Sequence, residues 1–157
     1  MIYSFIITTD RKDFMREYHI PAAFSLYDFR RFIENDLDFD DSQQGAFFLL
    51  NSEGKKIECY SLFDTGNGTM DSVNLIDMSN KEMSKLLYTF DFFNKRSLCI
   101  EFTGETEALP RTDYPLVAQS KGAAPGQFSD NPPEDEFPKI QEEEDGEEMY
   151  YDDYDEV

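Results

Sequence analysis

The uneven distribution of charge along the chain is the feature that most constrains its fold. Residues 1–120 carry 12 Lys and Arg against 20 Asp and Glu, a net charge of −8. Residues 121–157 carry 2 against 14, a net charge of −12, and the two parts sum to −20. So acidic a segment buries too little apolar surface to offset the entropy of ordering it. The sequence therefore predicts a folded domain followed by a disordered acidic tail at residues 129–157.

The N-terminal part has the patterns of a hairpin followed by a helix. Alternating apolar residues predict strands at residues 2–8 and 14–20, joined by a short link. Three- and four-residue apolar steps predict a helix over residues 26–37, with Ser25 as its cap and Asp28 completing a capping box. The charged residues expected on its outer face are Arg30, Arg31 and Glu34.

The sequence patterns in the middle of the chain predict the remaining elements of an α+β fold. Apolar runs bounded by turn residues predict strands at residues 46–50, 57–63, 86–93 and 97–103. Residues 73–85 favour a short extended piece and then a helical turn near residues 80–85. We therefore expect a single small domain at residues 1–103, with a largely antiparallel or mixed sheet packed on one main helix. The prolines and glycines of residues 104–128 favour an extended linker or wrap.

None of the catalytic or metal-binding motifs in the sequence is complete. Asp64-Thr65-Gly66 matches the aspartic protease tripeptide, but Asn67 follows where a small residue is needed. Residues 36–41 have part of the calcium-loop spacing, yet Asp41 replaces the obligatory glycine and Phe47 replaces the bidentate glutamate. The sequence thus predicts no cofactor and no metal, and it favours a function other than catalysis.

Cysteine usage and hydropathy indicate a cytoplasmic protein. Cys59 and Cys99 are the only cysteines, and they lack the spacing of a redox or zinc motif. No apolar run approaches the roughly 20 residues that span a bilayer. The net charge of −20 opposes direct binding to nucleic acid or to anionic membranes.

The acidic tail is the candidate partner-binding region. Its carboxylates suit a basic protein surface, and the tyrosines among them can stack or become buried on binding. The residues that we assign to partner binding are Glu142, Glu143, Glu144, Tyr150, Tyr151 and Tyr154. Two alternatives stay open: the tail only solvates the domain, or it folds back on Lys95-Arg96 or Lys55-Lys56.

Several segments together carry a family resemblance. They are Tyr3–Ile7, Phe14–Glu17, Leu26–Ile33, Phe39–Asp41 with Phe47-Phe48, and Leu87–Phe92. With these segments the chain resembles the plasmid Ri open-reading-frame-three-like family, in particular its Bacteroidetes-type members, over roughly residues 1–103. The family-motif residues are Tyr88, Phe90, Asp91 and Phe92. The resemblance implies an α+β fold and a bacterial context, but no reaction, and the acidic tail lies outside it.

Three functional hypotheses follow. The first is a non-catalytic accessory or interaction protein whose tail contacts basic partner surfaces. The second is a carboxylate-based or metal-dependent hydrolase; its candidate carboxylates are Asp36, Asp38, Asp40, Asp64 and Asp91. Asp91 comes first among these because it lies in the family motif, although we favour the structural explanation, in which Asp91 is a hydrogen-bond acceptor at a strand end or bulge. The third is a nucleic-acid-mimicking regulator. The sequence fixes neither the partner nor the oligomeric state.

Overall fold

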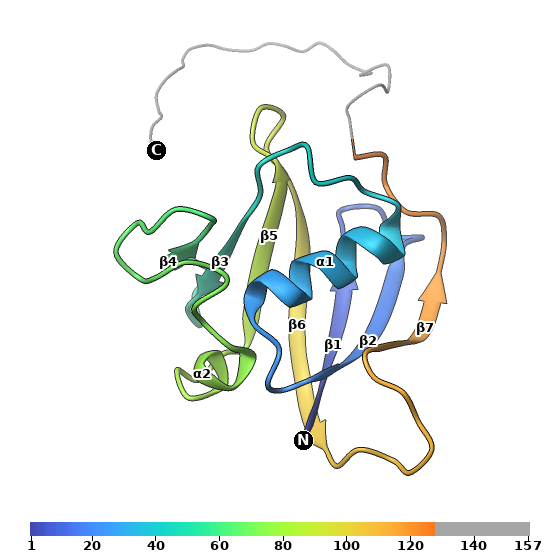
Figure 1. The fold of residues 1–157 in the computed structure, drawn as a ribbon. Coiled ribbons are helices and arrows are strands. Elements are labelled where there is room, and N and C mark those ends of the chain that lie inside the picture. The colour runs from blue at the N-terminus through green and yellow to red at the C-terminus, as the bar shows by residue number, and fades with distance from the viewer. Residues whose placement is uncertain (128–157) are drawn as a thin grey trace. The chain divides into compact units, whose positions relative to one another are not determined.

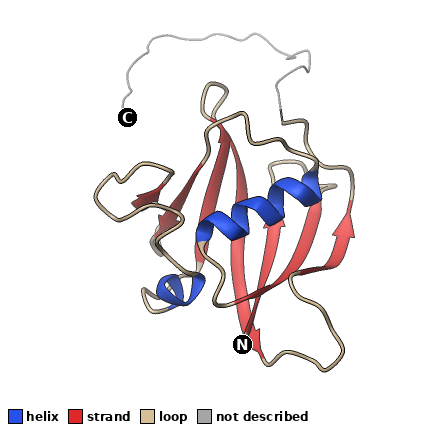
Figure 2. Ribbon diagram, viewed as in Figure 1, coloured by secondary structure: helices blue, strands red, loops and turns tan. Residues whose placement is uncertain are grey.

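The computed structural model of the chain describes residues 1–127, which form one seven-stranded sheet and two helices. The strands lie in the order β4-β3-β5-β6-β1-β2-β7, and every neighbouring pair is antiparallel (Figure 1). The elements are β1 Ile2–Thr8, β2 Met15–Pro21, α1 Leu26–Leu37, β3 Ala46–Leu50, β4 Lys56–Tyr60, α2 Leu75–Ser79, β5 Lys85–Asp91, β6 Arg96–Thr106 and β7 Leu116–Lys121. The predicted α+β class is confirmed, with α1 lying across one face of the sheet (Figure 2). The predicted tail, residues 129–157, lies outside the described residues.

Helix α1 begins and ends at local signals. The Ser25 hydroxyl accepts a hydrogen bond from the Asp28 N–H at 3.0 Å, and the Asp28 carboxylate accepts one from the Ser25 N–H at 3.1 Å. Asp38 ends the helix in the left-handed conformation, with φ 60°. These contacts satisfy backbone groups that a helix end leaves free. They confirm the predicted helix and its capping box.

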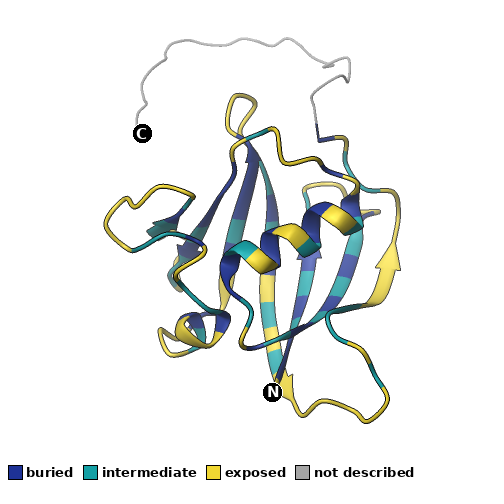
Figure 3. Cartoon of the chain, in the orientation of Figure 1, coloured by how far each residue is buried: buried dark blue, intermediate teal, exposed yellow. Residues whose placement is uncertain are grey.

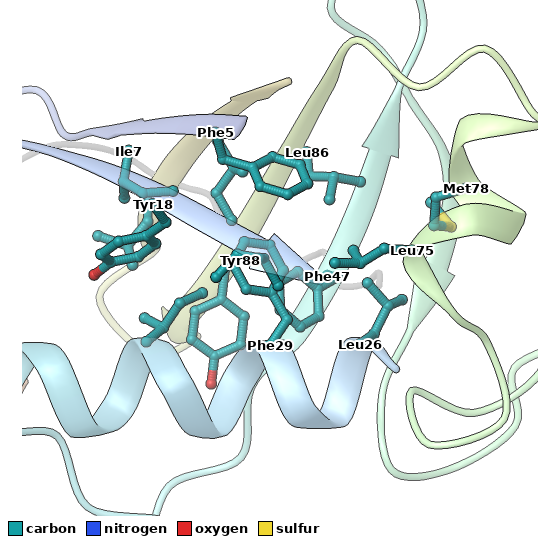
Figure 4. Close-up of a cluster of buried hydrophobic side chains, with 14 of the residues drawn as sticks. Phe5, Ile7, Tyr18, Leu26, Phe29, Phe47, Leu75, Met78, Leu86 and Tyr88 are labelled. Atoms are coloured by element: carbon teal, nitrogen blue, oxygen red, sulfur yellow. The ribbon is translucent and has the colours of Figure 1, made fainter. Parts of the chain in front are cut away.

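The core lies between α1 and the sheet (Figure 4). Phe29 of α1 stacks on Phe47 of β3, with ring centroids 5.8 Å apart, and Phe47 in turn contacts Tyr88 of β5 at 4.8 Å. Phe5 and Ile7 of β1 are fully buried on this side. Since side chains alternate along a strand, the residues between them point to the other face. The strands accordingly show alternating bands of burial (Figure 3).

Helix α2 lies earlier than predicted. The predicted helical turn near residues 80–85 is wrong, because those residues form the turn into β5 and the helix occupies Leu75–Ser79. Asn74 and Asp77 supply its capping box, and Leu75 and Met78, three residues apart, are buried in the core. No helix within residues 1–127 is long and apolar enough to cross a bilayer.

The segment after residue 103 contributes two features to the sheet that the sequence analysis did not predict. Strand β6 continues to Thr106, and β7 pairs antiparallel with β2 as the seventh strand. Gln127 then pairs with the backbone of Asp40: its Oε1 accepts from the Asp40 N–H and its Nε2 donates to the Asp40 carbonyl, both at 2.7 Å. Residues 1–127 therefore form one compact unit.

Candidate functional site

Asp91 is a buried acceptor at the turn between β5 and β6. It is 4% exposed and accepts hydrogen bonds from Asn94 N–H at 3.1 Å and Asn94 Nδ2 at 3.0 Å. It also pairs with Arg96 Nε at 3.1 Å. Burial raises the pKa of Asp91, but the bonds from Asn94 and the charge of Arg96 outweigh it and hold the pKa below its usual value. These contacts give Asp91 a structural role in the turn.

The aromatic residues of the family motif divide between the two faces of the sheet. Tyr88 and Phe90 are buried in the core at 2% and 3% exposure. Burial raises the pKa of Tyr88 to about 12. Phe92 is 49% exposed and contacts Phe48 edge-on, with centroids 6.5 Å apart. Although Tyr88, Phe90 and Phe92 alternate along the sequence, Phe92 does not share the buried face of the other two, because the β5–β6 register shifts and β5 ends at Asp91.

Asp36 belongs to an ionic cluster that the sequence analysis missed. Its Oδ2 accepts from Arg16 Nε at 3.2 Å and from the Tyr18 hydroxyl at 2.6 Å. Arg16 Nη1 also donates to the carbonyls of Lys121 at 3.2 Å and Gly122 at 3.1 Å. Burial and the Asp36 carboxylate raise the pKa of Tyr18. The cluster ties α1, β2 and the end of β7 together. The sequence did contain a signal for it, because Arg16 alternates in step with the inward-facing residues of β2.

Two residues expected on the solvent side of α1 are buried. Arg30 Nε pairs with Glu34 at 2.7 Å, and Arg30 Nη2 donates to the Gln43 carbonyl at 2.8 Å. The prediction that they lie on the outer face of the helix is wrong for Arg30 and Glu34, because the segment between α1 and β3, which contains Gln43, covers them. Arg31 is exposed as expected. Burial raises the pKa of Glu34 although Arg30 opposes it. Arg30 thus fixes this segment to the helix.

The remaining candidate carboxylates serve turns. Asp64 accepts hydrogen bonds from Gly66 N–H at 2.8 Å and Gly68 N–H at 3.1 Å, and these lower its pKa. Asp40 accepts from Ser42 in the same way. Such side-chain acceptors stabilise tight turns. The described part of the chain contains no group of three or more His, Cys, Asp or Glu placed to hold a metal ion. The structure therefore does not bring the hydrolase candidates together.

The described residues also include a surface depression and two thiols. An open depression of about 530 Å³ is lined by Met1 and by Glu105–Ala108. Cys59 and Cys99 are partly buried, and burial raises the pKa of the Cys59 thiol. The predicted partner-binding residues lie outside the described residues; they are Glu142, Glu143, Glu144, Tyr150, Tyr151 and Tyr154.

The fold and these contacts define a class of α+β protein in which one antiparallel sheet is covered by a helix on one face and the candidate carboxylates hold turns and elements together. The chain belongs to the plasmid pRiA4b ORF-3-like protein family, whose sequence model matches residues 5–149. The match extends beyond residue 103, so our expectation that the acidic tail lies outside the resemblance is wrong for most of it.

Comparison with solved structures supports the fold. The chain is similar to a protein of unknown function, MM3350, from Methanosarcina mazei Go1. The TM-score is 0.66 at 17% sequence identity, and the similarity covers 78% of this chain and 70% of that one. No curated protein matches the chain. At this identity the likeness shows the fold alone.

Proposed function

We propose that the chain is a non-catalytic interaction protein. In this proposal its acidic tail, residues 129–157, here also called the acidic segment, binds a basic surface of a protein partner. The observation that carries the proposal is the way in which the chain leaves the folded unit. Gln127, the last described residue, is 8% exposed and is held by three hydrogen bonds. Two join its side chain to the Asp40 backbone, and Arg96 Nη2 donates the third to its carbonyl at 2.7 Å. The acidic segment is thus attached at a fixed point.

The engagement of the carboxylates favours this proposal over the hydrolase. Asp36 is bound by Arg16 and Tyr18, Asp91 by Asn94 and Arg96. A catalytic carboxylate needs a proton or a metal within reach and a substrate beside it. These carboxylates instead close ion pairs and turns within the fold, as structural acceptors do.

The charge of the segment supports a basic partner. Residues 121–157 carry a net charge of −12, more than half of the total of −20. A concentrated negative charge speeds encounters with positive surfaces and repels acidic ones, and both effects weaken as salt screens the charges. Tyrosine rings add contact area of the kind that is enriched in protein interfaces.

Affinity capture with full-length variants tests the proposal. Glu142, Glu143 and Glu144 are changed together to glutamine in one variant, and Tyr150, Tyr151 and Tyr154 together to serine in another. We expect the natural chain to retain a basic protein from the lysate of its source cell, and both variants to bind that purified protein more weakly. High salt should weaken binding of the natural chain far more than that of the glutamine variant. Equal affinity of all three chains at every salt concentration would refute the proposal.

A further inference from the structure

The face of the sheet that points away from α1, here called the outer face, has no helix over it within residues 1–127 (Figure 2). Its side chains are the alternate residues of each strand, such as Ile6 between the buried Phe5 and Ile7. Antiparallel sheets can leave one face to solvent, and that face is then usually polar. Here the outer face combines apolar and charged residues in an ordered pattern.

The strand registers align six outer-face residues in one row across six strands. Each is the direct cross-strand partner of the next, so all six point the same way. From β4 to β2 the row is Lys56, Leu50, Lys85, Glu101, Ile6 and Glu17. Its charges therefore run positive, neutral, positive, negative, neutral, negative. When the row is followed in the opposite direction, from β2 to β4, each position that held a lysine holds a glutamate and each apolar position is again apolar.

That antisymmetry is what a two-fold interface requires. In a face-to-face dimer whose axis runs parallel to the strands between β5 and β6, each row meets its own reverse. Lys85 then faces Glu101 of the second copy, Leu50 faces Ile6, and Lys56 faces Glu17, each contact occurring twice. We infer that the outer face is the interface of a homodimer built on this row.

The next row supplies the apolar part of the interface. In strand order from β4 to β2 its members are Cys59, Phe48, Leu87, Cys99, Thr8 and Met15. Under the same two-fold axis Leu87 meets Cys99 of the second copy, and Phe48 meets Thr8. Lys56 Nζ and Phe92 both pack on the Phe48 ring and extend this surface. Neighbouring strands lie about 4.8 Å apart, so each row is roughly 24 Å wide.

Charge favours a second copy over a basic partner as the occupant. The first row is neutral, with two lysines and two glutamates, in a chain whose net charge is −20. A uniformly basic surface would meet Lys56 and Lys85 with like charge, which disfavours binding. Another copy of the chain pairs all four charges. This dimer uses the outer face, whereas the proposed function uses the acidic segment. An experiment that refutes one of these two proposals therefore leaves the other standing.

Reversing one charge of the central pair tests the inference. Two full-length variants are made, Lys85→Glu and Glu101→Lys, and their masses are measured by sedimentation over a range of concentrations. We expect the natural chain to dimerise and each variant to dimerise about a hundredfold more weakly, because like charges face each other twice. When the two variants are mixed, heterodimers should form at close to natural affinity, since each glutamate then faces a lysine of the other copy.

The mixing step separates assembly from folding. Lys85 and Glu101 are also cross-strand partners within one chain, so each variant sets like charges side by side and loses some stability. Mixing cannot repair a conflict within a chain, so recovered dimers would report the contact between copies. Arg31→Glu, on the exposed side of α1, is the matched control and should dimerise as the natural chain does. A monomeric natural chain, variants that dimerise normally, or a mixture without heterodimers would each overturn the inference.

Discussion

Asp91 accepts three hydrogen bonds from two residues that follow it within five positions of the chain. The Asn94 backbone and side chain both donate to it, and Arg96 bridges it to the Gln127 carbonyl. One carboxylate therefore orders the β5–β6 turn and, through Arg96, connects this turn to Gln127, the last described residue. The proposed function starts from the same residue, because Gln127 is where the chain passes out of the described part of the structure.

The lowered pKa of Asp91 predicts a pH-dependent contribution to stability. Because the folded-state pKa lies below the ordinary value of 3.8, the contribution is fully present above that value. It is lost as the pH falls through the folded-state pKa. At neutral pH we expect Asp91→Asn to lower the free energy of unfolding by about 2 kcal/mol, since the hydrogen bonds are to a charged group. Urea titrations should show that the difference in free energy of unfolding between the variant and the natural chain shrinks as the pH falls below the ordinary carboxyl pKa of 3.8.

Asp64→Asn is the matched control for this prediction. Its carboxylate also accepts two backbone hydrogen bonds and also has a lowered pKa, but it is exposed in its turn. We expect a clearly smaller loss of stability than for Asp91→Asn. If the two variants lose equal stability, or if the Asp91 difference does not change with pH, the buried ion pair does not act as described.

At the scale of elements, β7 depends on contacts made far away in sequence. It pairs with β2, and Arg16 holds the carbonyls at its end. Gly122 follows with φ +77°, and a Cβ there would lie 1.8 Å from the Asp13 carbonyl oxygen. Because that obstacle is backbone, no side-chain rotation can relieve it. The glycine is therefore what lets the chain turn closely past the β1–β2 connection.

Replacing Gly122 with alanine should loosen β7. We expect Gly122→Ala to lower the free energy of unfolding by about 2 kcal/mol or more, because strain at a positive φ adds to the backbone clash. Amide hydrogen exchange should accelerate most at Val117–Lys121. Gly54→Ala is the control: its φ is +82°, but nothing lies within 4 Å of the added Cβ, so strain alone should cost about 1 kcal/mol. Similar losses in both variants would show that the close approach has no energetic weight.

The same elements show which parts of the fold the sequence could predict. Helix α1 was predicted in full because Ser25, Asp28 and the apolar stripe are local signals. Strand β7 was missed because five of its six residues are exposed, which leaves little alternation to detect; its pairing with β2 makes it a strand. The Arg16–Asp36 pair was missed because 20 positions separate its members. Asp91 was named by the motif, but its donors became clear only with the turn.

At the scale of the whole molecule, the buried core and the densest charge lie in different parts of the chain. The buried hydrophobic core runs from Ile2 to Ile100, all within residues 1–127. The densest charge lies in residues 128–157, which contain 1 Lys against 14 Asp and Glu, a net charge of −13. Self-repulsion of such a segment costs the folded state little if the segment is not packed among the core elements. We therefore propose a division of roles in which residues 1–127 determine the stability of the chain and the acidic residues after them bind the partner.

Neutralising Glu142, Glu143 and Glu144 to glutamine in the full-length chain tests this division. We expect the free energy of unfolding to change by no more than about 0.5 kcal/mol, as for substitutions that break no buried contact. Binding to a basic partner should weaken in the same variant, because the attraction depends on those charges. A marked loss of thermal stability would instead indicate that the acidic segment folds back on the domain, with Lys95-Arg96 or Lys55-Lys56 as its docking site. Lys95→Gln should then reproduce that loss, and an unchanged Lys95→Gln variant would exclude the first of those two docking sites.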